Sequence, residues 1–170
     1  GVFLIQRGKL RFANDAMARI LGYSREELVG TTYMDLVEPE DSETQRQRRQ
    51  QREDGSRDLQ MYEIHLRRKD GRVILCEVRA DAVDYQGDIA STGTLRDITD
   101  ERRQQQAIAE AEARYRELFR DSPAGLFRSG IDGSIIEVNP AMARMMGYDS
   151  VEQLRAEVKD MLEVYANPEE

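Results

Sequence analysis

Apolar and polar residues alternate along two stretches of the chain, at residues 61–67 and 73–83. A period of two is typical of β-strands that bury one face, so both stretches predict strands, and residues 89–98 follow as a third predicted strand. Short turns separate the stretches at residues 69–72 and 86–88, and the first contains an Asp-Gly pair, which favours a hairpin. The pattern therefore predicts three consecutive antiparallel strands.

The chain also contains an internal repeat, because residues 14–23 recur in similar form at residues 139–148. Alternating apolar residues precede each copy and predict strands. In each copy an Asn is placed to cap a short helix that closes at a Gly. The first copy continues into the three predicted strands, whereas the second does not. We therefore expect one complete module followed by the front part of a second.

Two further segments predict helices of different character. Residues 42–52 contain almost no apolar side chain and predict a solvated helix. Residues 100–120 contain no Gly or Pro and predict a long connector helix with apolar residues spaced by three and four. This spacing fits the seam of a short coiled coil, or alternatively a helix that packs on its own domain. The seam consists of Gln104, Ile108, Ala111, Tyr115 and Leu118.

Composition narrows the possible functions. Of the 170 residues 39% are hydrophobic, enough for a core, and the net charge of −8 argues against binding to nucleic acid or to an anionic membrane. No apolar run approaches the roughly 20 residues of a membrane helix. The start at Gly1 lacks a signal-peptide pattern, which suggests a piece of a longer protein. The single cysteine, Cys76, suits the cytoplasm.

Candidate chemistry is sparse. The only histidine, His65, alternates with Glu63 and Arg67 and is expected on the polar face of its strand as a surface residue. Cys76 falls on the apolar face, where thiols are mostly inert. The sequence contains no phosphate-binding loop, metalloprotease motif or nucleophile elbow. We therefore predict no enzyme activity, no catalytic residues and no metal site.

The order and spacing of several short motifs resemble the PAS family of sensory domains over almost the whole chain. The residues that distinguish the flavin-binding and haem-binding members of the family are missing. Residues 33–38 contain no Cys, which the flavin-binding sensors have, and residues 42–52 contain no His, which the haem sensors have. No haem or flavin is therefore predicted, and any small-molecule ligand is unknown. The motifs that carry the resemblance are Asn14-Asp15-Ala16, Gly22-Tyr23, Pro39-Glu40-Asp41, Asp70-Gly71 and Asp97-Ile98-Thr99, with Asn139-Pro140-Ala141 and Gly147-Tyr148 in the second copy.

The resemblance implies an α+β fold: a five-stranded antiparallel sheet in order 2-1-5-4-3, with short helices on one face around a small cavity, then a long connector helix. It places a PAS domain at 1–99, the connector at 100–120 and the N-terminal part of a second PAS domain at 121–170. Ile5, Leu66 and Ile74 are also expected to face inward. The candidate cavity residues are Phe12, Met17, Tyr23, Met34, Tyr62, Ile64, Cys76 and Val78.

The implied function is that of a regulatory module in a bacterial signalling protein, a sensor histidine kinase or a cyclic-dinucleotide enzyme such as a diguanylate cyclase. A change in the cavity would shift the sheet, and Asp97 and Thr99 would relay the shift to the connector. We expect a homodimer, which Leu75 and Val83 on the outer sheet face can join, and a C-terminal output domain as the other partner. The alternative is a ligand-free dimerisation or relay module whose cavity is filled by its own side chains.

Overall fold

The computed structural model describes residues 1–53 and 59–158. They form two compact units, the first spanning Gly1–Gln104 and the second beginning at Gln105. Within the described residues, no helix is long and apolar enough to cross a membrane.

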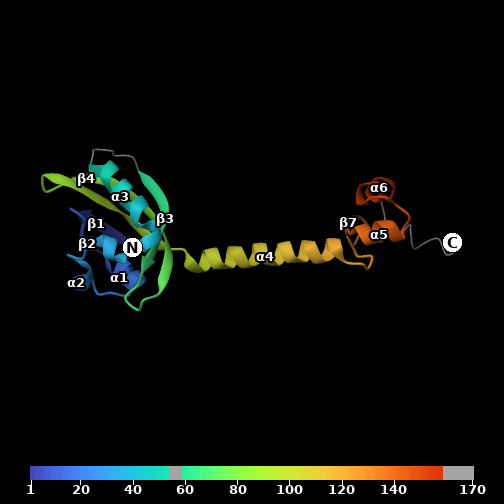
Figure 1. Ribbon diagram of the computed structural model, residues 1–170, viewed down its shortest axis with the longest axis horizontal. Helices are drawn as coiled ribbons and strands as arrows, with labels where there is room; N and C mark the ends of the chain where they lie inside the picture. Colours follow the sequence, from blue (N-terminus) through green and yellow to red (C-terminus); the bar gives the residue numbers. More distant parts are fainter. Residues whose placement is uncertain (54–58, 159–170) are drawn as a thin grey trace. The chain divides into compact units, whose positions relative to one another are not determined.

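The first unit is built on a five-stranded antiparallel sheet in the order β2-β1-β5-β4-β3 (Figure 1). This confirms the expected fold. The buried positions of the strand at residues 73–85 follow the predicted period of two, because Ile74, Cys76, Val78 and Ala80 are all at most 6% exposed. The last strand departs from it, since its buried residues Ala90 and Leu95 are five positions apart. The strands are β1 (Val2–Gln6), β2 (Lys9–Ala13), β3 (Gln60–Arg67), β4 (Val73–Tyr85) and β5 (Asp88–Asp97).

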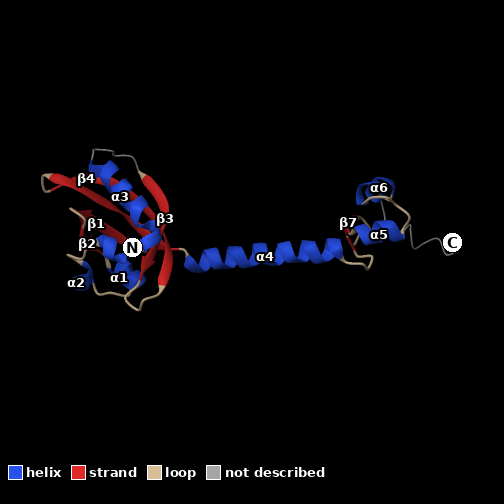
Figure 2. Ribbon diagram, in the orientation of Figure 1, coloured by secondary structure: helices blue, strands red, loops and turns tan. Residues whose placement is uncertain are grey.

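Short helices cover one face of the sheet (Figure 2). Asn14 caps the first of them, because its side-chain oxygen accepts the Met17 N–H at 3.0 Å, and Gly22 ends the helix in a left-handed conformation. Their buried residues, among them Leu21 and Leu36, join the strands in one core. The elements are α1 (Asp15–Leu21), α2 (Arg25–Leu28), the 3₁₀ helix η1 (Tyr33–Leu36) and α3 (Pro39–Glu53).

Strand β2 departs from the predicted alternation. Leu4 pairs with Phe12 and Ile5 pairs with Leu10, so Arg11 is the extra residue of a β-bulge. The bulge turns Leu10 inward and Phe12 outward, where its side chain is 49% exposed. The expectation that Phe12 faces the cavity is therefore wrong.

The predicted connector is a continuous helix, α4 (Thr99–Asp121), one residue longer at each end than the pattern indicates. Its beginning belongs to the first unit and its end to the second. None of its residues is buried within the chain.

The second unit repeats the front of the first. Its described part contains β6 (Phe127–Ser129), β7 (Ile135–Val138), α5 (Pro140–Met145) and α6 (Val151–Glu157). The core here is small and centres on Val138, Ala143 and Leu154. The second copy is also expected to contain Asn167-Pro168-Glu169 as the counterpart of Pro39-Glu40-Asp41, but these residues lie outside the described part of the chain.

Asn139 holds the second unit together and is fully buried. Its Oδ1 accepts the N–H groups of Met142 and Leu126, each at 2.9 Å. Its Nδ2 donates to the carbonyl oxygens of Phe119 and Ala124, at 3.0 and 2.8 Å. The predicted helix cap therefore also joins the end of α4 to β6 and α5.

Candidate functional site

A small cavity of about 50 Å³ lies in the first unit, between the sheet and the helices that cover it. Its lining is almost entirely apolar and draws on β1, β2, β3, β4 and β5 together with α1, η1 and α3. Four of the expected cavity residues line it: Met17, Tyr62, Ile64 and Val78.

The other expected cavity residues lie elsewhere. Tyr23 and Met34 are partly buried and pack against the core without lining the cavity, and Phe12 is exposed. Cys76 is fully buried in the core. Burial, with a smaller contribution from the nearby Asp97 carboxylate, raises the pKa of the Cys76 thiol to about 12. The thiol is therefore neutral and unreactive over the physiological range.

Several lining residues were not predicted, and one of them is polar. Gln45 of α3 is 1% exposed and lines the cavity. Its Nε2 has no hydrogen-bond partner among the described residues. A buried amide donor without a partner costs free energy, so this group favours an acceptor in the cavity. The sequence offered no signal for it, because Gln45 lies in a segment that lacks an apolar period.

Helix α3 contacts the sheet through polar and charged side chains. The Arg48 guanidinium lies over the Tyr62 ring at 4.1 Å from its centre. Added to the buried Gln45, this contact explains how a helix without an apolar face still covers a sheet. The predicted solvated helix is thus solvated on only one side.

The expected relay residues form a hydrogen-bonded junction where β5 ends and α4 begins. Thr99 donates its hydroxyl to Asp97 Oδ1 at 2.6 Å, and the same oxygen accepts the Thr99 N–H at 3.0 Å. The Thr99 hydroxyl also accepts the Leu75 N–H at 2.9 Å, while the Ile98 N–H donates to the Leu75 carbonyl at 2.9 Å. The junction therefore ties the first turn of α4 to the neighbouring strand β4 as well as to β5.

Charged pairs reinforce this junction on the outer face of the sheet. Arg102 of α4 donates to Glu63 of β3, and Arg96 of β5 donates to Glu101 at 2.6 Å. The hydrogen bond from Arg96 lowers the pKa of Glu101. Three strands thus contact the first turn of α4 directly.

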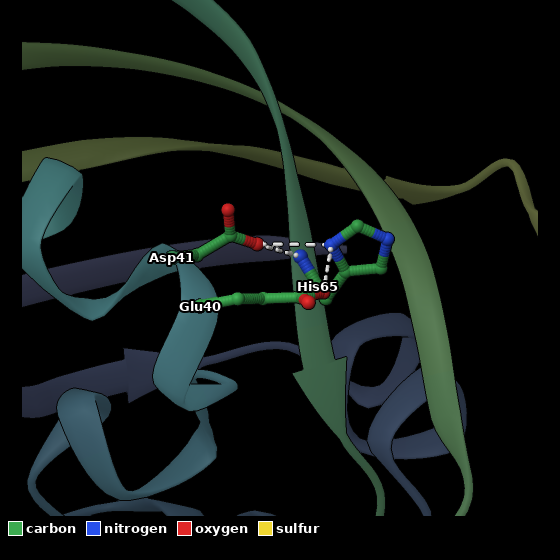
Figure 3. Close-up of side chains that lie close together, drawn as sticks. All are labelled: Glu40, Asp41 and His65. Carbon is green, nitrogen blue, oxygen red and sulfur yellow. Dashed lines mark hydrogen bonds and ion pairs between the residues drawn. The ribbon is translucent and has the colours of Figure 1, made fainter.

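A second cluster lies at the edge strand β3, where the start of α3 reaches it (Figure 3). His65 Nδ1 lies 3.0 Å from Asp41 Oδ2 and 3.1 Å from Glu40 Oε1. The His65 N–H also donates to Asp41 Oδ2 at 2.7 Å. Next to it, hydrogen bonds from Arg67 lower the pKa of Glu38. His65 is partly exposed, as its alternation predicts, but its acidic neighbours come from a segment 24 residues away.

The seam of α4 is exposed within one chain. Ile108 is 61% exposed and Leu118 66%, and Gln104 and Ala111 are also exposed. Tyr115 is engaged locally, since its ring stacks on Phe119 at 5.7 Å and its hydroxyl donates to Glu137 Oε2 at 3.1 Å. Pairing of this seam with a second chain stays a prediction.

Comparison with known proteins identifies the fold of both units. A family model described as PAS fold matches residues 1–98, and one described as PAS domain matches residues 113–170. No curated protein was found to match the chain.

Several solved structures share the fold at low sequence identity. A sensory box histidine kinase/response regulator from Burkholderia thailandensis has 22% identity and a TM-score of 0.52 over 69% of this chain and 91% of that chain. The PAS-B domain of Cycle from Drosophila melanogaster, solved with bound glycerol, has 15% identity and a TM-score of 0.52, covering 56% and 97%. A PAS domain from Desulfitobacterium hafniense has 21% identity and a TM-score of 0.50, covering 56% and 90%.

Proposed function

The chain belongs to the PAS family, because a PAS model matches more than half of it, and from this premise we propose that it is the sensing and relay part of a bacterial signal-transduction protein. The output domain is a histidine kinase or a cyclic-dinucleotide enzyme that follows in the parent protein. A cytoplasmic location, expected from the single cysteine, is part of the same proposal.

The observation that carries this proposal is the Thr99 junction. The Thr99 hydroxyl bridges the Asp97 carboxylate and the Leu75 N–H, so a shift between β4 and β5 cannot leave the first turn of α4 unchanged. Val78, which lines the cavity, lies two residues from Cys76, and Cys76 pairs directly with Asp97 across the sheet. A short path of packed strands thus leads from the cavity to the helix.

In the proposed mechanism the sheet has two arrangements that differ in the position of β5 against β4. Each arrangement favours a different packing of α4 against α4 of a second subunit. The exposed seam residues Ile108 and Leu118 supply the apolar surface for that pairing. The output domain responds to the packing of the two helices.

The volume of the cavity limits what it senses. A buried water needs about 10–15 Å³ of such volume, so about 50 Å³ holds a few waters or one very small organic molecule. The unpaired Gln45 Nε2 favours a guest with a hydrogen-bond acceptor. The alternative is a ligand-free dimerisation or relay module, which the small volume supports. Native mass spectrometry of the purified chain separates the two: a bound mass that is lost in Gln45→Leu supports a guest.

The relay is tested with a matched pair of substitutions on β4. Val78→Ile adds one methylene inside the cavity, whereas Val73→Ile adds the same group at a position that is 42% exposed. We expect Val78→Ile alone to change the hydrogen exchange of the backbone amides of residues 102–104 in α4. Identical exchange in both variants and the wild type would contradict the proposed path from cavity to helix.

A further inference from the structure

Against the expectation from the sequence that there is no metal site, we propose that Glu40, Asp41 and His65 form a binding site for one divalent transition-metal cation, with Zn²⁺ the best fit. Their ligand atoms all lie within 4.8 Å of one another (Figure 3). The site would join the start of α3 to the middle of β3. The site includes no residue that lines the cavity or forms the Thr99 junction. The metal proposal is therefore tested independently of the proposed function.

The distances suit a small cation. Ligand atoms around a tetrahedral Zn²⁺, with bonds of about 2.0–2.1 Å, lie about 3.3 Å apart. His65 Nδ1 is 3.0 Å from Asp41 Oδ2 and 3.1 Å from Glu40 Oε1. The two distances to His65 therefore need to lengthen by only a few tenths of an ångström, and the carboxylate oxygens of Glu40 and Asp41 lie within 4.8 Å of one another.

The donor set selects the class of metal. One imidazole nitrogen and two carboxylate oxygens suit zinc and its neighbours, whereas Mg²⁺ and Ca²⁺ prefer oxygen ligands alone. The side chains of His65 and Glu40 are 40% and 67% exposed, so an ion can enter from solvent and keep water in its fourth position. The single thiol of the chain, on Cys76, is buried and protonated and does not compete.

Charge and local structure also favour a cation here. Two carboxylates face one imidazole, a charge environment that attracts a cation. Asp41 Oδ2 is already oriented by the His65 N–H at 2.7 Å, which limits the freedom lost on binding. The nearby Glu38 is paired with Arg67 at 2.8 Å, so that arginine is not directed at the site.

The site would connect two walls of the cavity. Gln45 lies one helical turn after Asp41, and Ile64 and Leu66 flank His65; all three line the cavity. A cation that joins Asp41 to His65 would therefore hold α3 against β3 at the point where both enclose the cavity. Metal occupancy would stiffen this part of the domain.

The test uses the full chain without a histidine tag. His65 is the only histidine, so its imidazole signals in NMR report this site alone. Titration with Zn²⁺ alone should show one equivalent bound and a shift of the imidazole signals. His65→Gln and Asp41→Asn should each weaken binding at least about tenfold. Glu43→Gln is the matched control, because Glu43 lies on the same helix but is exposed and pairs with Arg46 at 3.6 Å; it should bind like the wild type.

Two results would overturn the proposal. Equal zinc affinity in His65→Gln and the wild type would place the ion elsewhere on the acidic surface. Zinc binding that leaves the amide hydrogen exchange of residues 41–45 and 62–66 unchanged would refute the link between α3 and β3. Slower exchange in both segments, absent in His65→Gln, supports it. Mg²⁺ at the same concentration should leave the imidazole signals unchanged.

Discussion

Replacing Thr99 by Val tests the junction between sheet and helix with the least change of shape. The valine keeps the β-branched outline but removes the hydroxyl that donates to Asp97 and accepts from Leu75. The Asp97 carboxylate loses one of its two hydrogen bonds to Thr99, because it still accepts the backbone N–H of residue 99. The Leu75 N–H loses its acceptor altogether.

The expected cost follows from these two losses. A hydrogen bond to a charged group contributes about 1.5–3 kcal/mol, and a backbone N–H left without a partner costs about 1–3 kcal/mol. Both groups are only partly buried, which reduces each figure, and the added methyl group recovers some free energy. We therefore expect the free energy of unfolding of the first unit to fall by about 2 kcal/mol. For a domain of this size that lowers Tm by roughly 10 °C.

The assay follows thermal unfolding of the full chain through NMR signals of the first unit. Thr94→Val is the matched control, since Thr94 lies on the same strand and is exposed; it should leave Tm within about 2 °C. Thr99→Ser restores the hydroxyl and should recover most of the stability. A loss in Thr99→Val no larger than in Thr94→Val would refute the assigned hydrogen bonds.

Three further predictions concern other parts of the chain. Gly93→Ala should destabilise the first unit by about 3 kcal/mol or more, measured by urea unfolding, because a Cβ there would lie 2.1 Å from the Arg79 carbonyl oxygen. The raised pKa of Cys76 means that stability is complete below pH 9 and falls as the unfolded thiol ionises; at about pH 10.5 the loss relative to Cys76→Ala should be about 2 kcal/mol. Asn139→Asp should weaken amide protection in the second unit more than Asn14→Asp does in the first, because it loses the donors to Phe119 and Ala124.

Each of these has a contrary outcome. A folded Gly93→Ala of wild-type stability would mean that β4 and β5 are further apart than described. A parallel pH profile for the wild type and Cys76→Ala would show that the thiol ionises alike in the folded and unfolded states. Equal losses of amide protection in Asn139→Asp and Asn14→Asp would mean that Asn139 acts only as a helix cap.

The sequence predicted the sheet well where local rules suffice. Alternation placed Ile74, Cys76 and Val78 inward, because a regular antiparallel strand leaves the period of two undisturbed. It failed at Phe12, because the bulge at Arg11 shifts the period by one residue. A bulge depends on pairing with the neighbouring strand, which a single segment does not reveal.

The parts of the candidate sites that were missed depend on tertiary contacts. Gln45 looks like any polar residue of a solvated helix, and only the packing of α3 on the sheet buries it. His65 was correctly placed on the polar face, but its approach to Asp41 requires the start of α3 to lie against the edge of β3. Thr99 and Asp97 were found from the family resemblance, whereas the third member of the junction, the Leu75 N–H, was not.

Communication between the cavity and α4 through the Thr99 junction can be measured with a double-mutant cycle. Val78→Ile is introduced into the wild type and into Thr99→Val, and the exchange free energies of the amides of residues 102–104 are measured in all four proteins. If the junction carries the signal, Val78→Ile changes these values in the wild type but hardly at all once Thr99 is Val, a coupling of about 0.5 kcal/mol or more. Equal changes in both backgrounds would contradict it.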